Sequence, residues 1–388
     1  MNRKTGAEPV KRLAGTTVLF LFGSLEMGGA EGQGLLLARH LLEKEGAAVQ
    51  VWGLGAVRGA VADQCDHWGI PWRAMPLHWG LRRRLPHLLR LFRFLRAERP
   101  AILLSYTTVP NLAAALLWRR CGVRLCIWNQ ADAGLCLPPT LLHRLAISRI
   151  RHLVANAEGG RQYLLETFGV APSQVHLIRN GVSLTAPLDD RRTWRQRLGV
   201  ADDTVVAVMV ANLSRYKDHA TLLQAWQHLL ARAHPAQPPL LALAGRCDDQ
   251  ADPLRRQAAQ LGIEHRVRFL GTVADVSGLL AAADLCVHSS RSEGIPNAVL
   301  EAMASGLPVV GSAIPGMHEA VGDEGSAFLA PPGQPALLAD QLERLLGDQA
   351  LRRAQGEVMR RRAENLFGRD RMCRETVALL EQCLGEPL

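Results

Sequence analysis

Residues 285–310 read LCVHSSRSEGIPNAVLEAMASGLPVV. A short apolar run is followed by a polar loop with glycine and proline, a helical stretch that begins near Pro296, and a second apolar run at 308–310. Strands that are apolar on both faces and joined by a helix are typical of a parallel sheet covered by helices. This stretch therefore predicts one strand–helix–strand unit of an α/β protein.

The same alternation extends over the whole chain of 388 residues. The predicted strands are 18–22, 49–52, 102–104, 125–128, 153–155 and 175–178 in the first half, and 205–210, 240–244, 267–270, 285–287, 308–310 and 327–329 in the second. About six units in each half are enough for two doubly wound sheets. We expect a Rossmann-like domain at 1–185, a second Rossmann-like domain at 186–365, and a C-terminal helix at 366–388 that packs back on the first domain.

The composition and the charge limit the classes of function. Hydrophobic residues make up 48% of the chain and aromatic residues only 5%, which fits a globular protein and disfavours a base-stacking nucleic-acid binder. Residues 1–188 contain 23 basic and 11 acidic residues, a net charge of +12, whereas the remainder has a net charge of −3. This asymmetry predicts an anionic partner for the first half, such as a phosphorylated substrate or a membrane surface.

Neither a membrane span nor a metal or cofactor site is expected. The eight cysteines form no CxxC pair and indicate reduced thiols in a cytoplasmic protein. No run of about 18 apolar residues is uninterrupted, and the apolar run at 18–22 enters a glycine loop rather than a signal-peptide cleavage site. The thirteen histidines show no clustered ligand set, and HExxH, Walker A, GxSxG and Asp-x-Asp motifs are absent.

Three loops that directly follow predicted strands contain the residues with useful chemistry, because ligands of such sheets bind beyond the carboxyl ends of the strands. The loop at 23–32 is rich in glycine and opens a helix, an arrangement that favours phosphate. The loop at 210–219 places cations where they can meet a diphosphate, and the loop at 289–309 contains two glutamates. Eight helical residues span about 12 Å, so this spacing does not favour a glycosidase pair of carboxylates.

On these residues the chain resembles a family 4 retaining glycosyltransferase with the GT-B fold, in which two doubly wound domains face each other across a cleft. The motifs that carry the resemblance are Gly28-Gly29-Ala30-Glu31, Ile178-Arg179-Asn180-Gly181-Val182, Asn212-Leu213-Ser214-Arg215-Tyr216-Lys217-Asp218, Arg268-Phe269-Leu270-Gly271, and Glu293-Gly294-Ile295-Pro296-Asn297-Ala298-Val299-Leu300-Glu301 with Gly306-Leu307-Pro308-Val309-Val310 after it. The resemblance is most specific from about 205 to 330.

The resemblance implies transfer of a hexosyl or N-acetylhexosaminyl group from a UDP-, GDP- or ADP-sugar to a glycan or lipid-linked acceptor, without a metal. It also implies a role in bacterial cell-surface polysaccharide, lipopolysaccharide or glycolipid synthesis. The first domain would bind the acceptor and the second the donor. The implied catalytic residues are Lys217 and Glu293, and the implied donor-binding residues are Gly28, Gly29, Asn212, Arg215, Lys217, Leu270, Val273, Glu293, Gly294, Ile295, Pro296, Asn297 and Glu301.

Within this resemblance, Lys217 would neutralise the diphosphate and Glu301 would bind the ribose hydroxyls. Glu293 and the backbone of 294–297 would hold the sugar and the phosphates, and Leu270 to Val273 would border the base. Two departures stand out: Asn212 occupies a position where such proteins often have arginine, and the loop at 129–134 lacks the histidine that many members have. We therefore assign no acceptor-side base.

Other classes remain open at this point. A GT-B-like epimerase or hydrolase, or a nucleotide-sugar-binding protein without activity, would show the same donor motifs. A nucleic-acid binder is disfavoured because aromatic residues are not interleaved with the basic ones through most of the first half.

A basic stretch at 81–99 predicts peripheral contact with anionic lipid at the inner face of the cytoplasmic membrane. On a helical wheel, an apolar face is formed by Leu85, Leu88, Leu89, Phe92 and Leu95. The basic residues Arg83, Arg90 and Arg93 lie opposite or on the flank, with Phe94 among them. A helix packed on its own sheet, with a solvated basic back, is the alternative.

Overall fold

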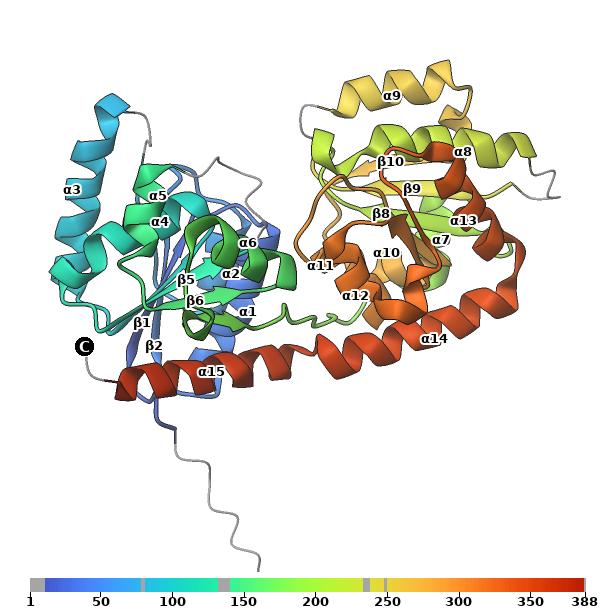
Figure 1. The fold of residues 1–388 in the computed structure, drawn as a ribbon. Helices are drawn as coiled ribbons and strands as arrows, with labels where there is room; N and C mark the ends of the chain where they lie inside the picture. The colour runs from blue at the N-terminus through green and yellow to red at the C-terminus, as the bar shows by residue number, and fades with distance from the viewer. Residues whose placement is uncertain (1–10, 78–80, 132–139, 233–237, 248–249, 387–388) are drawn as a thin grey trace, which may run out of the picture. The chain divides into compact units, whose positions relative to one another are not determined.

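The structure, a computed structural model, describes residues 11–77, 81–131, 140–232, 238–247 and 250–386. The chain forms two compact units. Unit 1 is Met1–Gly181 with Asp370–Leu388, and unit 2 is Val182–Arg369 (Figure 1). No helix in the described ranges is long and apolar enough to cross a membrane.

Unit 1 is built on a parallel sheet of seven strands in the order β3-β2-β1-β4-β5-β6-β7. The strands are β1 (Thr17–Phe22), β2 (Ala48–Gly53), β3 (Trp72–Ala74), β4 (Ile102–Tyr106), β5 (Leu125–Gln130), β6 (His152–Ala155) and β7 (Val175–Leu177). The helices are α1 (Gly29–Glu43), α2 (Ala60–Trp68), α3 (Leu81–Glu98), α4 (Thr108–Leu117), α5 (Leu141–Ile147), α6 (Glu158–Phe168) and α15 (Arg369–Gly385). The strand order reverses between β1 and β4, as in doubly wound folds.

The central strand β1 shows why this sheet is buried on both faces. Phe20 and Phe22 pack into the core on one face, and Leu19 and Leu21 into the core on the other. Successive side chains of a strand point to opposite faces, so an uninterrupted apolar run can only lie between two layers of helices. Figure 1 shows helices on both sides of this sheet.

The last helix, α15, belongs to the core of unit 1, although it follows unit 2 in the sequence. Its residues Cys373, Val377 and Leu380 are buried with β1 and α1 in one apolar cluster. The helix runs along the sheet of unit 1 in Figure 1.

Unit 2 repeats the plan with six parallel strands in the order β10-β9-β8-β11-β12-β13, and the order reverses between β8 and β11. The strands are β8 (Val206–Val210), β9 (Leu240–Ala244), β10 (Val267–Gly271), β11 (Leu285–His288), β12 (Val309–Ser312) and β13 (Leu329–Ala330). The helices are α7 (Arg191–Leu198), α8 (His219–Arg232), α9 (Ala251–Gln260), α10 (Val276–Ala282), α11 (Asn297–Ala304), α12 (Pro315–Ser326), α13 (Pro335–Gly347) and α14 (Gln349–Leu366).

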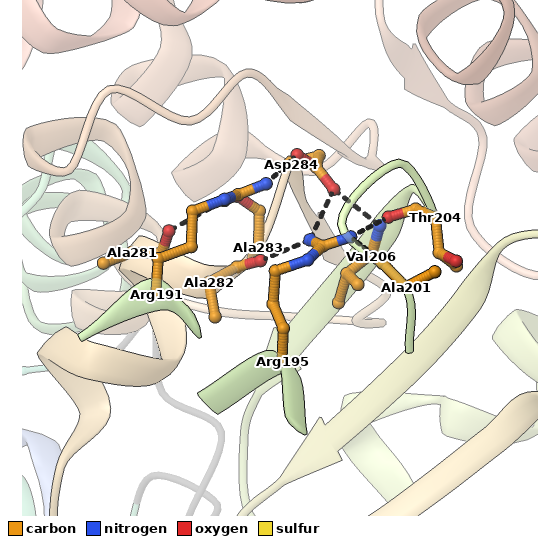
Figure 2. A network of polar contacts seen from close by, with 9 residues as sticks. All are labelled: Arg191, Arg195, Ala201, Thr204, Val206, Ala281, Ala282, Ala283 and Asp284. Carbon is orange, nitrogen blue, oxygen red and sulfur yellow. Dashed lines mark hydrogen bonds and ion pairs between the residues drawn. The ribbon is translucent and has the colours of Figure 1, made fainter. Parts of the chain in front are cut away.

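A buried arginine attaches α7 to the sheet of unit 2 (Figure 2). Arg195 is only 2% exposed and donates hydrogen bonds to the carbonyl oxygens of Ala282 (3.0 Å), Ala201 (2.7 Å) and Thr204. It also pairs with Asp284 at 3.4 Å, whose other oxygen accepts from the neighbouring Arg191 at 2.7 Å. The buried charge is tolerated because both terminal nitrogens of the guanidinium find acceptors, and these contacts hold the first helix of the unit in place.

Two details of unit 1 differ from the sequence-based expectation. The edge strand β3 was not predicted, because its three residues are too short a run to show a period. The predicted apolar face of α3 is confirmed only in part: Leu95 is buried and Leu88 and Phe92 pack against the core, whereas Leu85 and Leu89 are 66% and 49% exposed. Leu91, outside that face, is also buried. The side chains of 81–84, which include Arg83, lie outside the described residues.

Phe94 of α3 packs against the core and does not lie on an open basic face. Its ring meets Trp52 edge-on at 6.5 Å between centroids, and the guanidinium of Arg73 lies 4.8 Å from its centroid. An aromatic ring with a cation on its face fits the margin of a core, which explains its place among arginines.

Candidate active site

The two polar loops of unit 2 follow β8 and β11, the neighbouring strands at which the strand order reverses. The first loop leads through a short 3-10 turn, Arg215–Lys217, into α8. The second leads from His288 through Glu293 into α11. Because carboxyl ends of parallel strands meet at one edge of the sheet, the topology brings Lys217 and Glu293 together.

Hydrogen bonds join the two loops directly. The hydroxyl of Ser289 donates to the carbonyl oxygen of Lys217 at 3.0 Å, and the single hydroxyl hydrogen of Ser290 is shared between the carbonyl oxygen of Tyr216, at 3.0 Å, and Glu293. The backbone N–H of Arg291 donates to the same carbonyl of Tyr216 at 2.8 Å. The Lys217 loop and the Glu293 loop therefore form one rigid surface.

Glu293 is held through one of its two carboxylate oxygens. Its Oε1 accepts from Lys217 Nζ, from Ser290 Oγ at 2.9 Å and from His288 Nε2 at 3.2 Å. One carboxylate oxygen is thus fixed by three protein donors, and a carboxylate has further lone pairs that can accept a hydrogen bond from a ligand hydroxyl.

The protonation states of this cluster follow from its burial. Burial raises the pKa of Glu293, but the hydrogen bond from His288 and the charge of Lys217 outweigh it, and the pKa lies at about 2. Burial lowers the pKa of His288, so it donates to Glu293 as a neutral imidazole. Burial, together with His288 and Lys217, also lowers the pKa of the adjacent His219 to about 3. The site near neutral pH is an ion pair beside two neutral histidines.

Glu301 behaves in the opposite way. It lies on α11, is partly exposed, and burial of its carboxyl raises its pKa to about 7. The two glutamates of the predicted motif therefore differ in charge at neutral pH, Glu293 being ionised and Glu301 about half protonated. Two carboxyl groups with such different environments are suited to different tasks.

The turn between Glu293 and α11 presents backbone. Ile295 and Pro296 are buried, so their side chains anchor the turn and do not face a ligand. Gly294 lies against Gly316 of α12: a Cβ at Gly316 would fall 1.7 Å from the carbonyl oxygen of Gly294. Asn297 begins α11, where the first-turn N–H groups of a helix favour an anion.

The remaining predicted donor residues of unit 2 lie at the same edge of the sheet. The side chain of Asn212 accepts a hydrogen bond from the backbone N–H of Arg246, which follows β9, at 3.2 Å. Arg215 is exposed. Leu270 lies in β10 and Val273 follows it, both partly buried.

Gly28 and Gly29 belong to unit 1, where Gly28 is the N-cap of α1. A Cβ at Gly28 would fall 2.5 Å from the carboxylate of Glu31, which is itself buried. After β4, Thr107 has φ +69° and ψ 166°, a conformation that glycine almost alone adopts freely. Strain of this kind is concentrated at functional sites, and no pattern in the sequence predicts it at Thr107.

The loop expected after residue 128 begins later than the sequence indicates. Asn129 and Gln130 continue β5 rather than forming the loop, and residues 132–139 lie outside the described part. The side chain of Asn129 donates to the carbonyl oxygen of Ser105 at 3.1 Å, and that of Asn111 donates to the carbonyl oxygen of Asn129 at 2.9 Å. These amides join the ends of β4 and β5.

Sequence reasoning missed three residues of the unit 2 site. His288 and Ser290 share Glu293 Oε1 with Lys217, and Gly316 makes room for the turn. The signal available for His288 and Ser290 was their position as polar residues directly after the buried run at 285–287. Gly316 had no local signal, because its partner lies on another loop.

The class of protein follows from the two doubly wound units and from solved structures of like fold. Anabaena Alr3699/HepE in complex with UDP-glucose is 23% identical with a TM-score of 0.81, covering 94% of this chain and 99% of that one. WaaG, a glycosyltransferase involved in lipopolysaccharide biosynthesis, is 18% identical with a TM-score of 0.72, covering 93% and 99%. The fold is GT-B, as the sequence predicted.

The family follows from the sequence matches. Residues 28–181 match the family described as "Glycosyl transferase 4-like domain", and residues 190–362 match "Glycosyl transferases group 1". The chain belongs to these family 4 glycosyltransferases.

Curated relatives support the same family. The D-inositol 3-phosphate glycosyltransferase of Salinispora arenicola (strain CNS-205) is 32% identical over 254 residues, 62% of this chain and 56% of the relative. That of Streptomyces bingchenggensis (strain BCW-1) is 29% identical over 241 residues, 60% and 53%. The chain spans about half the length of the curated relatives it matches.

Proposed function

We propose that this chain is a retaining glycosyltransferase that binds a nucleotide-sugar in unit 2. The observation that carries the proposal is the ion pair of Lys217 and Glu293 at the edge where the strand order of unit 2 reverses, with Glu301 on the following helix. This edge is where doubly wound sheets bind nucleotides.

The pair can change partners when a donor binds. Lys217 leaves Glu293 for the diphosphate, and Glu293 remains ionised because His288 and Ser290 still donate to its Oε1. Its Oε2 accepts from a hydroxyl of the transferred sugar. Cleavage of the sugar–phosphate bond builds negative charge on the leaving diphosphate, and Lys217 together with the N-terminus of α11 stabilises that charge.

The same arrangement supports catalysis without a metal or other cofactor at the donor site. Lys217 and helix N–H groups supply the positive field that a divalent cation would otherwise supply. Rates that rise steeply with added Mn²⁺ or Mg²⁺ would contradict this model of the donor site.

We propose a UDP-sugar as the donor, with a hexosyl or N-acetylhexosaminyl group transferred with retention. The support is the likeness in fold to a structure that holds UDP-glucose. Glu301 would bind the ribose, Leu270 and Val273 would border the base, and Asn212 and Arg215 would lie near the phosphates. From unit 1, Gly28 and Gly29 would contact the donor.

For the acceptor we propose an anionic molecule, a phosphorylated polyol or a lipid-linked phosphate of a cell-surface glycan pathway in the cytoplasm. Residues 1–188 have a net charge of +12, and the curated relatives are named for an inositol phosphate. Acceptor binding would therefore belong to unit 1.

Contact with an anionic membrane is part of this proposal and rests on α3. Leu85 and Leu89 are exposed one turn apart, and Arg90 and Arg93 are exposed beside them. Exposed apolar side chains flanked by arginines fit the interface of an anionic lipid bilayer. Co-sedimentation with vesicles should need anionic lipid and should fall in a Leu85→Ser/Leu89→Ser variant. Binding that does not depend on lipid charge would contradict this membrane contact and favour a soluble acceptor.

The deciding experiment is a panel of UDP-, GDP- and ADP-sugars with inositol phosphate and lipid-linked phosphates, read out as released nucleotide and as the anomeric configuration of the product. Nucleotide release that needs the acceptor supports a transferase. Release without acceptor would indicate a hydrolase or epimerase, and donor binding without turnover would indicate a binding protein.

A further inference from the structure

A second group of chemically reactive side chains lies in unit 1, at the C-terminal end of α15. His152 is the first residue of β6, Cys383 lies in the last turn of α15, and Glu386 follows that helix. The potential ligand atoms of these three residues all lie within 4.8 Å of one another. The sequence did not point to this group, because the fold joins residues about 230 positions apart in the chain.

The distance between His152 and Glu386 suits a tetrahedral metal, and the thiol lies within 4.8 Å of both. The Nε2 of His152 is 3.4 Å from the nearer carboxylate oxygen of Glu386. Ligand atoms bound about 2.0–2.2 Å from one tetrahedral ion lie about 3.4 Å apart. Cys383 is buried and Glu386 is exposed, so the carboxylate at the helix end can adjust and an ion can enter from solvent.

His176 of β7 orients His152. Its Nε2 lies 3.4 Å from the Nδ1 of His152, with the ring centroids 5.6 Å apart. If His152 donates through Nδ1–H to His176, its Nε2 lone pair points toward Glu386. Metal-binding histidines nearly always use the other ring nitrogen in this way.

We propose that His152, Cys383 and Glu386 bind a zinc-class transition metal ion, with His176 positioning His152. Imidazole, thiolate and carboxylate are the ligand types of Zn²⁺, and three protein ligands leave a fourth position for water. The thiolate and the carboxylate together balance the charge of the dication. The ion would attach the end of α15 to the edge of the sheet formed by β6 and β7.

The alternative is a proton in place of the metal. His152 could donate through Nε2–H to Glu386 and accept through Nδ1 from His176, which satisfies these three side chains but makes no use of the thiol. The two arrangements predict different behaviour toward added metal.

The experiment uses the full-length chain, stripped of metal and reduced. It is titrated with Zn²⁺ against a chromophoric chelator, and with Co²⁺ to read thiolate-to-cobalt charge-transfer absorption. We expect one equivalent of Zn²⁺, and weakening of at least about tenfold in Cys383→Ser, Glu386→Gln and His176→Phe. The cobalt band should persist in Glu386→Gln and vanish in Cys383→Ser. Zn²⁺ should raise the melting temperature of the parent but not of Cys383→Ser.

Cys247→Ser is the matched control, because Cys247 is exposed and lies in unit 2. It should bind like the parent. Binding that is lost in Cys247→Ser, or unchanged in both Cys383→Ser and Glu386→Gln, would overturn the proposal. So would a parent chain that binds no Zn²⁺ and shows only a pH-dependent melting shift in Glu386→Gln, the result expected of the proton arrangement. Glu386 is exposed near the chain end, so this variant should fold.

Discussion

Adding a single methyl group at Gly316 of α12 should displace the turn between Glu293 and α11 and thereby lower activity. A Cβ at this position would lie 1.7 Å from the carbonyl oxygen of Gly294 and 2.9 Å from that of Glu293. Cβ contacts below 3.0 Å essentially do not occur, so in Gly316→Ala the turn must move by about 1.3 Å or more. A misplacement of about 1 Å costs about 100-fold in rate. Overpacking costs about 1–3 kcal/mol of stability.

The assay is kcat with the donor and acceptor that the panel identifies, measured well below the melting temperature. We expect kcat to fall about 100-fold and the melting temperature to fall by roughly 2–10 °C. Gly347→Ala is the control, since a Cβ there has no atom within 4 Å, and it should leave both unchanged. If Gly316→Ala kept kcat within about threefold of the parent, the reasoning that the turn must hold its place for catalysis would be refuted.

Four further predictions test the site and the fold. Lys217→Ala should lower kcat more than about tenfold, since a charge-assisted contact is worth about 1.5–3 kcal/mol. Glu301→Ala should mainly raise the Kd for UDP-glucose. If both variants kept the kcat and the Kd of the parent, the site would not lie at these residues. The pKa of Glu301 is about 7 in the free protein, and ribose hydroxyls donate to its ionised form. The affinity for UDP-glucose, measured by calorimetry, should therefore increase by up to about tenfold for each unit of increasing pH below 7 and stay constant above 7. Glu301→Gln should remove this pH dependence. Arg195→Ala should lower the free energy of unfolding by about 3–5 kcal/mol in denaturant titrations, against less than about 1 for the exposed Arg197→Ala. Since Gly28 and Glu293 belong to different units, UDP-glucose should reduce the radius of gyration measured by small-angle scattering, and identical curves would count against closure.

Periodicity was sufficient to predict the two sheets, and the position of the loops after strands was sufficient to predict that the polar loops of unit 2 meet at one edge. Uninterrupted apolar runs such as 18–22 and 240–244 have only one physical solution, burial on both faces. Lys217 and Glu293 could be paired in advance because both follow strands of one parallel sheet. Their roles toward the donor stay predictions.

What the sequence could not show depends on contacts between distant elements. The buried face of α3 was predicted only in part because leucine occurs all around that helix, and only the neighbouring core decides that Leu91 is buried and Leu85 is exposed. Gly316 and the cluster at His152 each depend on a partner in another loop or helix. A local sequence pattern cannot predict such tertiary contacts.

The chain passes between the units twice, and the two passages are hydrogen-bonded to each other. The backbone N–H of Val182 donates to the carbonyl oxygen of Phe367 at 2.6 Å, and that of Arg369 donates to the carbonyl of Val182 at 3.1 Å. Unit 2 is therefore one continuous segment whose two ends lie next to each other, and unit 1 consists of the two segments on either side of it. A gene that joins Gly181 to Asp370 through a short linker should encode unit 1 alone. The unit of a relative that corresponds to unit 2 should be exchangeable at the junction of Gly181 and Asp370.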